Sequence, residues 1–201
     1  MYFTDNIDEI TDIILNGGVV LLQVDTIFGL ICDGLNKKAI DRVIEIKQRK
    51  KPSFGFFVRN LNIAKRYAEF NEKQENIFNK VFPGYFTLIL KANEVAINKI
   101  PEYALGKINN TKTIGIRVPN SDFCLKLLGK FNTPLLATSA NISGQSTATL
   151  FEEIDKTITE SVNAVYYNKD VKIAGLSSTI LDITDIDNCK IIRKGSGVLD
   201  F

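Results

Sequence analysis

The stretch GGVVLLQVDTIFGL, residues 17–30, combines an apolar run with a polar turn. Its run from Gly18 to Val24 has the length and composition of a fully buried strand. Just before it, apolar residues recur at helical spacing over residues 7–14, and the two glycines end that helix. A helix followed by a buried strand indicates an α/β protein in which helices pack on a sheet.

Strands and helices alternate along most of the remaining chain. Further strands are expected at residues 54–58, 86–91, 113–118, 134–138, 164–167, 179–182 and 190–193, and helices at 35–47, 63–68, 73–81, 123–130 and 150–158. The polar residues 93–112 are expected to form a mobile loop. Because the closing strands have no helices between them, we predict an open twisted mixed sheet with helices packed on it, in a single domain spanning residues 1–201.

The composition favours a cytoplasmic protein. The chain has 201 residues, of which 45% are hydrophobic, and this is enough to bury a sizeable core. No run approaches the ~18 apolar residues of a membrane span, and the start of the chain is acidic where a secretory signal would be basic. Three scattered cysteines fit reduced thiols better than a disulfide framework. We therefore expect no membrane association.

The sequence contains no histidine. This excludes Ser-His-Asp and Cys-His machinery, histidine general bases and most transition-metal sites. Enzymes that position charged substrates, as in phosphoryl and nucleotidyl transfer, need no histidine. The net charge of +2 gives no argument for a dedicated nucleic-acid binder.

Polar clusters stand at the ends of predicted strands and helices, where an open α/β sheet binds its ligands. They are residues 25–29, the cationic run 47–51, Arg117 in an apolar strand, residues 138–144, and residues 177–179 with 193–194. Each also fits a structural role: the cationic run as the last turn of a helix, Arg117 as half of a buried ion pair, and residues 138–144 as a capped turn. Lys47, a cation that closes a helix at the mouth of a site, is expected to serve a ligand more than the core.

The order of these clusters resembles a known family. QVDTIFGL, IKQRKKP, PGYFTLIL, TIGIRVP, ATSANISG, SSTILD and IIRKG are similar, in that sequence, to the motifs of the YrdC family, the L-threonylcarbamoyladenylate synthases of tRNA modification. The resemblance covers about residues 10–195. Its most specific parts are the K-x-R of Lys47 and Arg49 and the S-x-N of Ser139 and Asn141.

The resemblance implies a single-domain YrdC-like fold with a concave cationic site. It also implies a nucleotidyltransferase that makes threonylcarbamoyl-AMP and pyrophosphate from ATP, L-threonine and bicarbonate or CO2, with Mg²⁺. The product would pass to a separate threonylcarbamoyl transferase complex that modifies tRNA. By the family pattern, ATP would be bound by Lys47, Arg49, Lys51, Thr113, Ser139, Asn141, Thr147 and Arg193. Lys47, Arg49, Ser139 and Asn141 would be catalytic, and threonine would be held by Thr26, Arg117, Ala137 and Ser178.

Several positions depart from the family pattern. Gln23 and Val24 replace the usual proline and threonine, Phe28 replaces a tyrosine, and a histidine that many members carry near Phe56 is absent. Tyr85 brings its motif closer to the YciO-like branch of the family. Two alternatives are therefore kept: a YciO-like paralogue without efficient synthesis, and a double-stranded RNA-binding protein that uses the cationic concavity.

Overall fold

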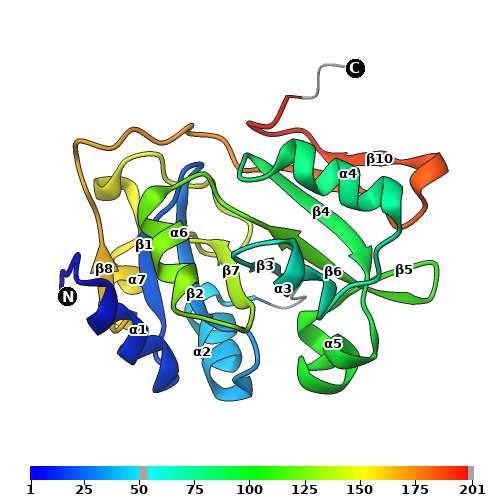
Figure 1. Ribbon diagram of the computed structural model, residues 1–201. Coiled ribbons are helices and arrows are strands. Elements are labelled where there is room, and N and C mark those ends of the chain that lie inside the picture. Colours follow the sequence, from blue (N-terminus) through cyan, green and yellow to red (C-terminus); the bar gives the residue numbers. More distant parts are fainter. Residues whose placement is uncertain (50–53, 199–201) are drawn as a thin grey trace.

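The computed structural model describes residues 1–49 and 54–198, and ten strands of this part of the chain form one sheet in the order β10-β9-β4-β6-β3-β7-β2-β1-β8, with β5 on β6 (Figure 1). The strands are β1 (Val20–Gln23), β2 (Phe28–Asp33), β3 (Gly55–Phe57), β4 (Phe86–Lys91), β5 (Gly106–Ile108), β6 (Thr111–Arg117), β7 (Leu135–Ser139), β8 (Ala164–Tyr166), β9 (Thr179–Asp182) and β10 (Lys190–Arg193). Three pairs, β1 with β8, β3 with β6 and β4 with β9, are parallel, and the others are antiparallel. The predicted mixed sheet is confirmed.

Helices cover both faces of the sheet. They are α1 (Ile7–Leu15), α2 (Lys37–Lys47), α3 (Leu61–Lys65), α4 (Glu72–Val81), α5 (Glu94–Lys99), α6 (Asp122–Gly129) and α7 (Lys156–Ser161), with 3-10 turns at Glu102–Ala104, Phe151–Glu153 and Ile186–Asn188. None of the helices in the described residues has the length and apolar character that crossing a lipid bilayer requires.

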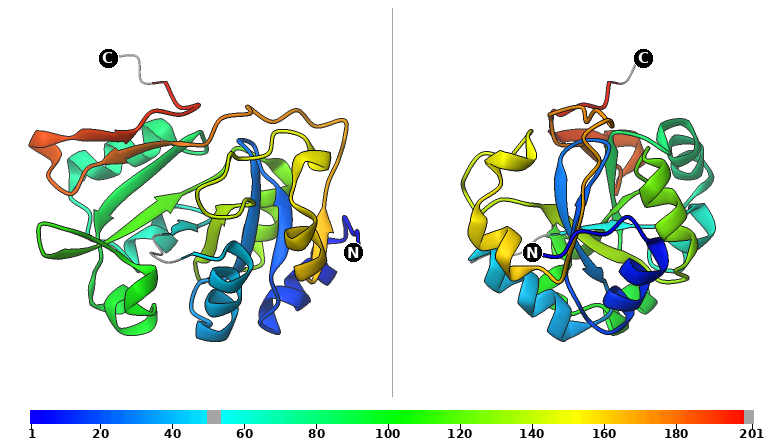
Figure 2. Two further views of the ribbon diagram at one scale, coloured as in Figure 1. Left: turned by 180° about the vertical axis from the view of Figure 1, so that it is seen from behind. Right: turned by 90° about the vertical axis from the view of Figure 1, so that its left-hand side faces the viewer.

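The buried strand β1 divides its side chains between two hydrophobic clusters. Leu21 packs with the apolar side chains of α2 and α7, whereas Val20 and Leu22 pack with those of α1 and α6. Successive side chains of a strand point to opposite faces, so α1 and α6 lie on one face and α2 and α7 on the other, as Figure 2 shows. All four residues of β1 are buried, which explains its continuous apolar run.

Three expectations from the sequence are wrong. The sequence does not predict strand β2, because the first residues of this strand belong to the polar cluster 25–29; β2 forms an antiparallel hairpin with β1. Residues 93–112 are not a loop: they hold α5, a 3-10 turn and the β5–β6 hairpin, which turns on Asn109 and Asn110 with φ of 47° and 65°. The helix expected from residue 150 starts at Lys156, because Asp155 caps it.

A long connection joins the two ends of the sheet. Residues 167–178, named here the crossing segment, run from β8 at one edge to β9 near the other (Figure 1). The backbone N–H groups of Ala174 and Gly175 donate to the carbonyls of Asp25 and Thr26, each at 2.9 Å. The segment is thereby tied to the turn between β1 and β2.

Candidate functional site

A cavity of about 290 Å³ lies over the middle of the sheet. Val24, Ile31, Phe57 and Ala137 line it and also belong to the cluster that packs α1 and α6. The cavity is therefore on the face of the sheet that carries these two helices.

The cavity exists because small residues meet across the central strands. Gly115 of β6, Gly55 of β3 and Ala137 of β7 are paired in register, and Ile89 of β4 and Ile31 of β2 continue the row at its two ends. All five residues line the cavity. Since the two glycines have no side chains, the sheet surface between the isoleucines stays open.

Cationic and hydroxyl groups dominate the polar lining. Among the described residues that line the cavity, three are arginines and none is acidic. The arginines are Arg49, Arg117 and Arg193, and the hydroxyl groups come from Thr26, Thr87, Thr113, Thr138, Ser139, Ser177 and Ser178. Such a set of donors suits an anionic ligand or one with a carboxylate or phosphate group.

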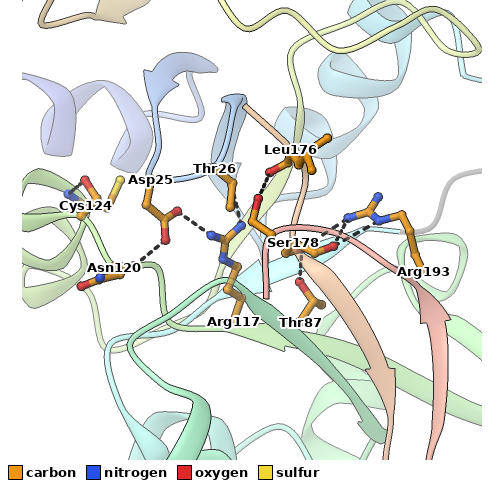
Figure 3. A network of polar contacts seen from close by, with 11 residues as sticks. Asp25, Thr26, Thr87, Arg117, Asn120, Cys124, Leu176, Ser178 and Arg193 are labelled. Carbon is orange, nitrogen blue, oxygen red and sulfur yellow. Dashed lines mark hydrogen bonds and ion pairs between the residues drawn. The ribbon is translucent and has the colours of Figure 1, made fainter. Parts of the chain in front are cut away.

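Arg117, at the end of β6, is held between two residues of the β1–β2 turn (Figure 3). Its Nη2 donates to Asp25 Oδ1 at 2.5 Å and its Nη1 donates to Thr26 Oγ1 at 2.9 Å. The guanidinium also lies 5.6 Å from the centre of the Phe57 ring. Nε of Arg117 is buried and has no hydrogen-bond partner among the described residues. The expected partner of this buried arginine is thus a carboxylate of the protein itself, and the guanidinium keeps unused N–H capacity.

Ser178 and Arg193 meet beside this arginine. Arg193 donates to the Ser178 carbonyl through Nε at 3.2 Å and Nη2 at 2.9 Å, and Nη2 is also 3.3 Å from Ser178 Oγ. The Ser178 hydroxyl is 2.8 Å from the Thr87 hydroxyl on β4. Partial burial and the nearby charge of Arg117 lower the pKa of Arg193. These contacts fix one wall of the cavity near the start of β9.

Lys47 ends α2 with its ammonium group buried against the end of β7. Nζ donates to the carbonyl oxygens of Ser139 and Asn141, the latter at 2.8 Å, and to Asn141 Oδ1 at 3.1 Å. The Ser139 hydroxyl in turn donates to Asn141 Oδ1 at 2.6 Å. Lys47 is 2% exposed and is bonded within the protein, and the expectation that it serves a ligand more than the core stays a prediction. Burial, and the charge of Arg49, lower its pKa to about 7.

Arg49 leaves this helix end in another direction. Gln48 adopts a left-handed conformation with φ of 51°, which stops α2 and redirects the chain. Arg49 Nη1 then reaches Thr138 Oγ1 at 3.3 Å, and its guanidinium lies 5.2 Å from the centre of the Phe54 ring. Burial lowers the pKa of Arg49. Both cations of the K-x-R motif therefore contact the end of β7. Lys47 donates to the carbonyl of Ser139, and Arg49 donates to the hydroxyl group of Thr138.

The structure brings most of the predicted site residues to one place. Eight of them line the cavity: Thr26, Arg49, Thr113, Arg117, Ala137, Ser139, Ser178 and Arg193. Lys47 and Asn141 are bonded to Ser139 but do not line it, and Thr147, half-buried in the loop after β7, does not line it either. Lys51 lies outside the described residues.

The sequence alone assigns no individual role to three polar residues of this site. Asp25 and Thr138 belong to the predicted polar clusters 25–29 and 138–144, and in the structure the Asp25 carboxylate holds Arg117. Thr87 and Thr138 line the cavity from β4 and near the end of β7. Thr87 could have been found in the sequence, because it is a hydroxyl residue in the otherwise apolar start of the strand FTLILK, residues 86–91.

A metal site built by the protein does not fit the described residues. They contain no group of three or more His, Cys, Asp or Glu side chains that could hold a metal ion. The donors of the cavity are hydroxyl groups and guanidinium groups, and guanidinium groups repel cations.

Fold and site together define a mixed-sheet α/β protein with a cavity over the centre of its sheet, and the arginines and hydroxyl groups of its lining suit an anionic ligand. The family model of Sua5, yciO and yrdC proteins, described as telomere recombination, matches residues 12–195, and the chain belongs to this family. A putative threonylcarbamoyl-AMP synthase of Methanocaldococcus jannaschii is 36% identical over 184 residues, which cover 90% of this chain and 82% of that protein. The uncharacterized protein YciO of Escherichia coli is 27% identical over 95% of this chain and 89% of its own length.

Solved structures from both branches of the family are similar. Pyrococcus abyssi Sua5 complexed with L-threonine superimposes with a TM-score of 0.83 at 25% identity, covering 94% of this chain and 54% of that protein. Escherichia coli YciO superimposes with a TM-score of 0.82 at 26% identity, covering 96% of this chain and 90% of that protein. The chain thus spans about half of the Pyrococcus protein and nearly all of YciO. The open mixed-sheet fold predicted from the sequence is confirmed.

Proposed function

We propose that this protein is an L-threonylcarbamoyladenylate synthase, an enzyme of the nucleotidyltransferase class. The observation that carries the proposal is a single cavity lined by three arginines, seven hydroxyl residues and no acidic residue among those described. The synthase names of several relatives, and the L-threonine bound to Pyrococcus abyssi Sua5, support it.

In this proposal Arg117 receives the carboxylate of threonine. Thr26 and Ser178 stand on either side of it and supply hydroxyl groups, while Ala137 leaves room for the ligand. The triphosphate of ATP lies along Arg49, Arg193, Thr113 and Ser139, with Lys47 and Asn141 supporting the end of β7. Arg117 and Arg193 both line the cavity and lie on either side of Ser178 (Figure 3), so the proposal puts the two substrates side by side.

The chemistry consists of two bond-forming steps. The uncharged amine of threonine adds to the carbon of CO2 or bicarbonate and gives a carbamate, with loss of a proton or of water. A carbamate oxygen then attacks the α-phosphorus of ATP, and the bond from that phosphorus to the bridging oxygen breaks as pyrophosphate leaves. The arginines stabilise the negative charge that grows on the leaving group, and close positioning of the two substrates supplies much of the remaining acceleration.

Mg²⁺ would enter this reaction on the phosphates of ATP, since the described residues offer no carboxylate cluster to hold it. Delivery of the product to a threonylcarbamoyl transferase complex, direct contact with tRNA, and a cytoplasmic location stay predictions. A YciO-like paralogue would have the same cavity but no efficient synthesis. Only a measurement of turnover therefore distinguishes a synthase from such a paralogue. The double-stranded RNA-binding alternative predicts steeply salt-dependent RNA binding instead.

The test is pyrophosphate release from ATP with all substrates present and with threonine or bicarbonate omitted singly. We expect release to need both, and mass spectrometry to detect threonylcarbamoyl-AMP. Release that is indifferent to threonine, from protein shown to be folded, would overturn the proposal. Tight RNA binding without any turnover would favour the RNA-binding alternative.

A further inference from the structure

The carboxylate of Asp25 is committed on both of its oxygen atoms. Oδ1 accepts from Arg117 Nη2, and Oδ2 accepts from the backbone N–H of Asn120 at 2.7 Å (Figure 3). The side chain of Asp25 is 3% exposed and that of Arg117 is 6% exposed. Asp25 does not line the cavity, whereas Arg117 does. Asp25 therefore acts on a ligand through Arg117.

The position of Asp25 is itself fixed from several sides. Its carbonyl accepts from Ala174 of the crossing segment at 2.9 Å, and Asn120 directly precedes the N-cap of α6. The neighbouring Thr26 takes a second N–H of the guanidinium at 2.9 Å. Two contacts on different nitrogens fix both the place and the plane of the guanidinium, which a bidentate contact with a carboxylate requires.

The pair also has a consequence for charge. Asp25 neutralises Arg117, so the pair itself adds no net charge to the cavity. Arg193, by contrast, donates to the neutral oxygens of Ser178 and keeps its positive charge for a ligand. A phosphate placed on Arg117 would stand close to the Asp25 carboxylate in a buried setting, where like charges repel strongly. An amino acid brings its own ammonium group and has no net charge.

We propose that Asp25 is a positioning and specificity-determining residue: it orients Arg117 for the carboxylate of a zwitterionic amino acid and excludes phosphate groups from that end of the cavity. This inference rests on the proposed function, because it concerns how the threonine and triphosphate ends are kept apart. Rejection of the wrong ligand by a placed like charge is a recognised route to specificity.

The first variant is Asp25→Asn, which keeps the shape and removes the charge. Threonine and ATP are titrated calorimetrically into folded protein, and threonine is titrated again in the presence of pyrophosphate. We expect threonine affinity to fall roughly tenfold with little change for ATP. Pyrophosphate should leave threonine binding to the wild type unchanged but compete with threonine in the variant. Loss of both affinities together, or equal effects of pyrophosphate on both proteins, would overturn the proposal.

Asp25→Glu keeps the charge and so retains an ion pair even if the Asn variant does not fold. The added methylene moves Arg117, so threonine should bind more weakly, yet pyrophosphate should still fail to compete. Competition in this variant would contradict the charge assignment. Glu75→Gln is the matched control, because it breaks a remote ion pair of 2.6 Å to Lys65, and it should behave as the wild type.

Turnover by the wild-type protein distinguishes a failure of the proposed function from a failure of the role given to Asp25. If the wild type shows no threonine-dependent pyrophosphate release, the proposed function fails and this inference fails with it. If the wild type turns over and Asp25→Asn binds threonine normally without pyrophosphate competition, only the role of Asp25 is overturned.

Discussion

Nζ of Lys47 donates hydrogen bonds to both the carbonyl and the side-chain oxygen of Asn141, at 2.8 Å and 3.1 Å. With the further bond to the Ser139 carbonyl, this ammonium group joins the last turn of α2 to the loop that follows β7. The backbone contact of Ser143 N–H with the Lys47 carbonyl, at 3.0 Å, ties the same two segments again. The K-x-R and S-x-N motifs are therefore one structural unit.

Replacement of this ammonium group should cost stability as well as activity. Lys47→Met keeps much of the aliphatic stem and leaves the carbonyls of Ser139 and Asn141 without their donor. Buried acceptors without a partner are costly, so at a pH of about 10, where burial of the lysine charge no longer opposes folding, we expect the free energy of unfolding to fall by about 2–3 kcal/mol. Urea denaturation measures it, and Lys73→Met, at a side chain that is 70% exposed, is the control. A variant as stable as the wild type would contradict this role.

Lys47 should also make stability depend on pH. Its pKa is lowered to about 7 by burial and by Arg49, whereas a lysine in the unfolded chain has a pKa of about 10.4. Between these values the unfolded chain binds the proton more tightly, so the contribution of Lys47 to the free energy of unfolding rises with pH. The slope is at most about 1.4 kcal/mol per pH unit. Denaturation at several pH values should show a slope difference between wild type and Lys47→Met; parallel curves would contradict it.

Gly55 and Gly115 line the cavity side by side, so a larger residue at Gly55 should reduce ligand binding without reducing stability. In Gly55→Val the new Cβ would meet only the Ala137 carbonyl oxygen, at 3.6 Å, an ordinary contact. A β-branched residue suits a strand better than glycine, so the melting temperature should stay the same or rise. The side chain would fill the open surface beside Gly115, and turnover should fall at least about tenfold.

Gly129→Ala is the matched control for this variant. A Cβ at Gly129 meets nothing within 4 Å, and this residue ends α6 away from the cavity lining. It should retain full turnover and gain slightly in stability. Full turnover in Gly55→Val as well would show that no ligand uses the open sheet surface.

Local sequence signals predicted those parts of the fold that local interactions determine. The helix expected at residues 35–47 is α2, and it is capped locally by Asn36, whose side chain accepts from the N–H groups of Lys38 and Ala39. The cavity could not be predicted in this way, because it depends on the register that brings Gly55 beside Gly115, sixty positions later in the chain. The role of Asp25 could not be predicted for the same reason, since its partner Arg117 is 92 positions away.

Gln23 shows why a departure from the family motif needs the structure to be interpreted. The sequence alone gave no reason for a polar residue at the end of a buried strand. Its side chain is almost completely buried at 4% exposure. Nε2 donates to the Val171 carbonyl at 2.7 Å, and Oε1 accepts from the N–H of Asn168 at 2.8 Å. The residue thus fastens the crossing segment to the end of β1.

Gln23→Leu should therefore loosen the crossing segment without unfolding the sheet. The substitution leaves the Val171 carbonyl and the Asn168 N–H without partners, at a cost of about 1–3 kcal/mol. Hydrogen exchange followed by mass spectrometry should show faster exchange in residues 167–178, including the amides that bond to Asp25 and Thr26. Gln74→Leu is the matched control, because it removes a buried amide contact of 2.7 Å to the Ile183 carbonyl elsewhere. It should lose stability while leaving exchange in residues 167–178 unchanged. Equal exchange of this segment in both variants would mean that Gln23 supports only the core.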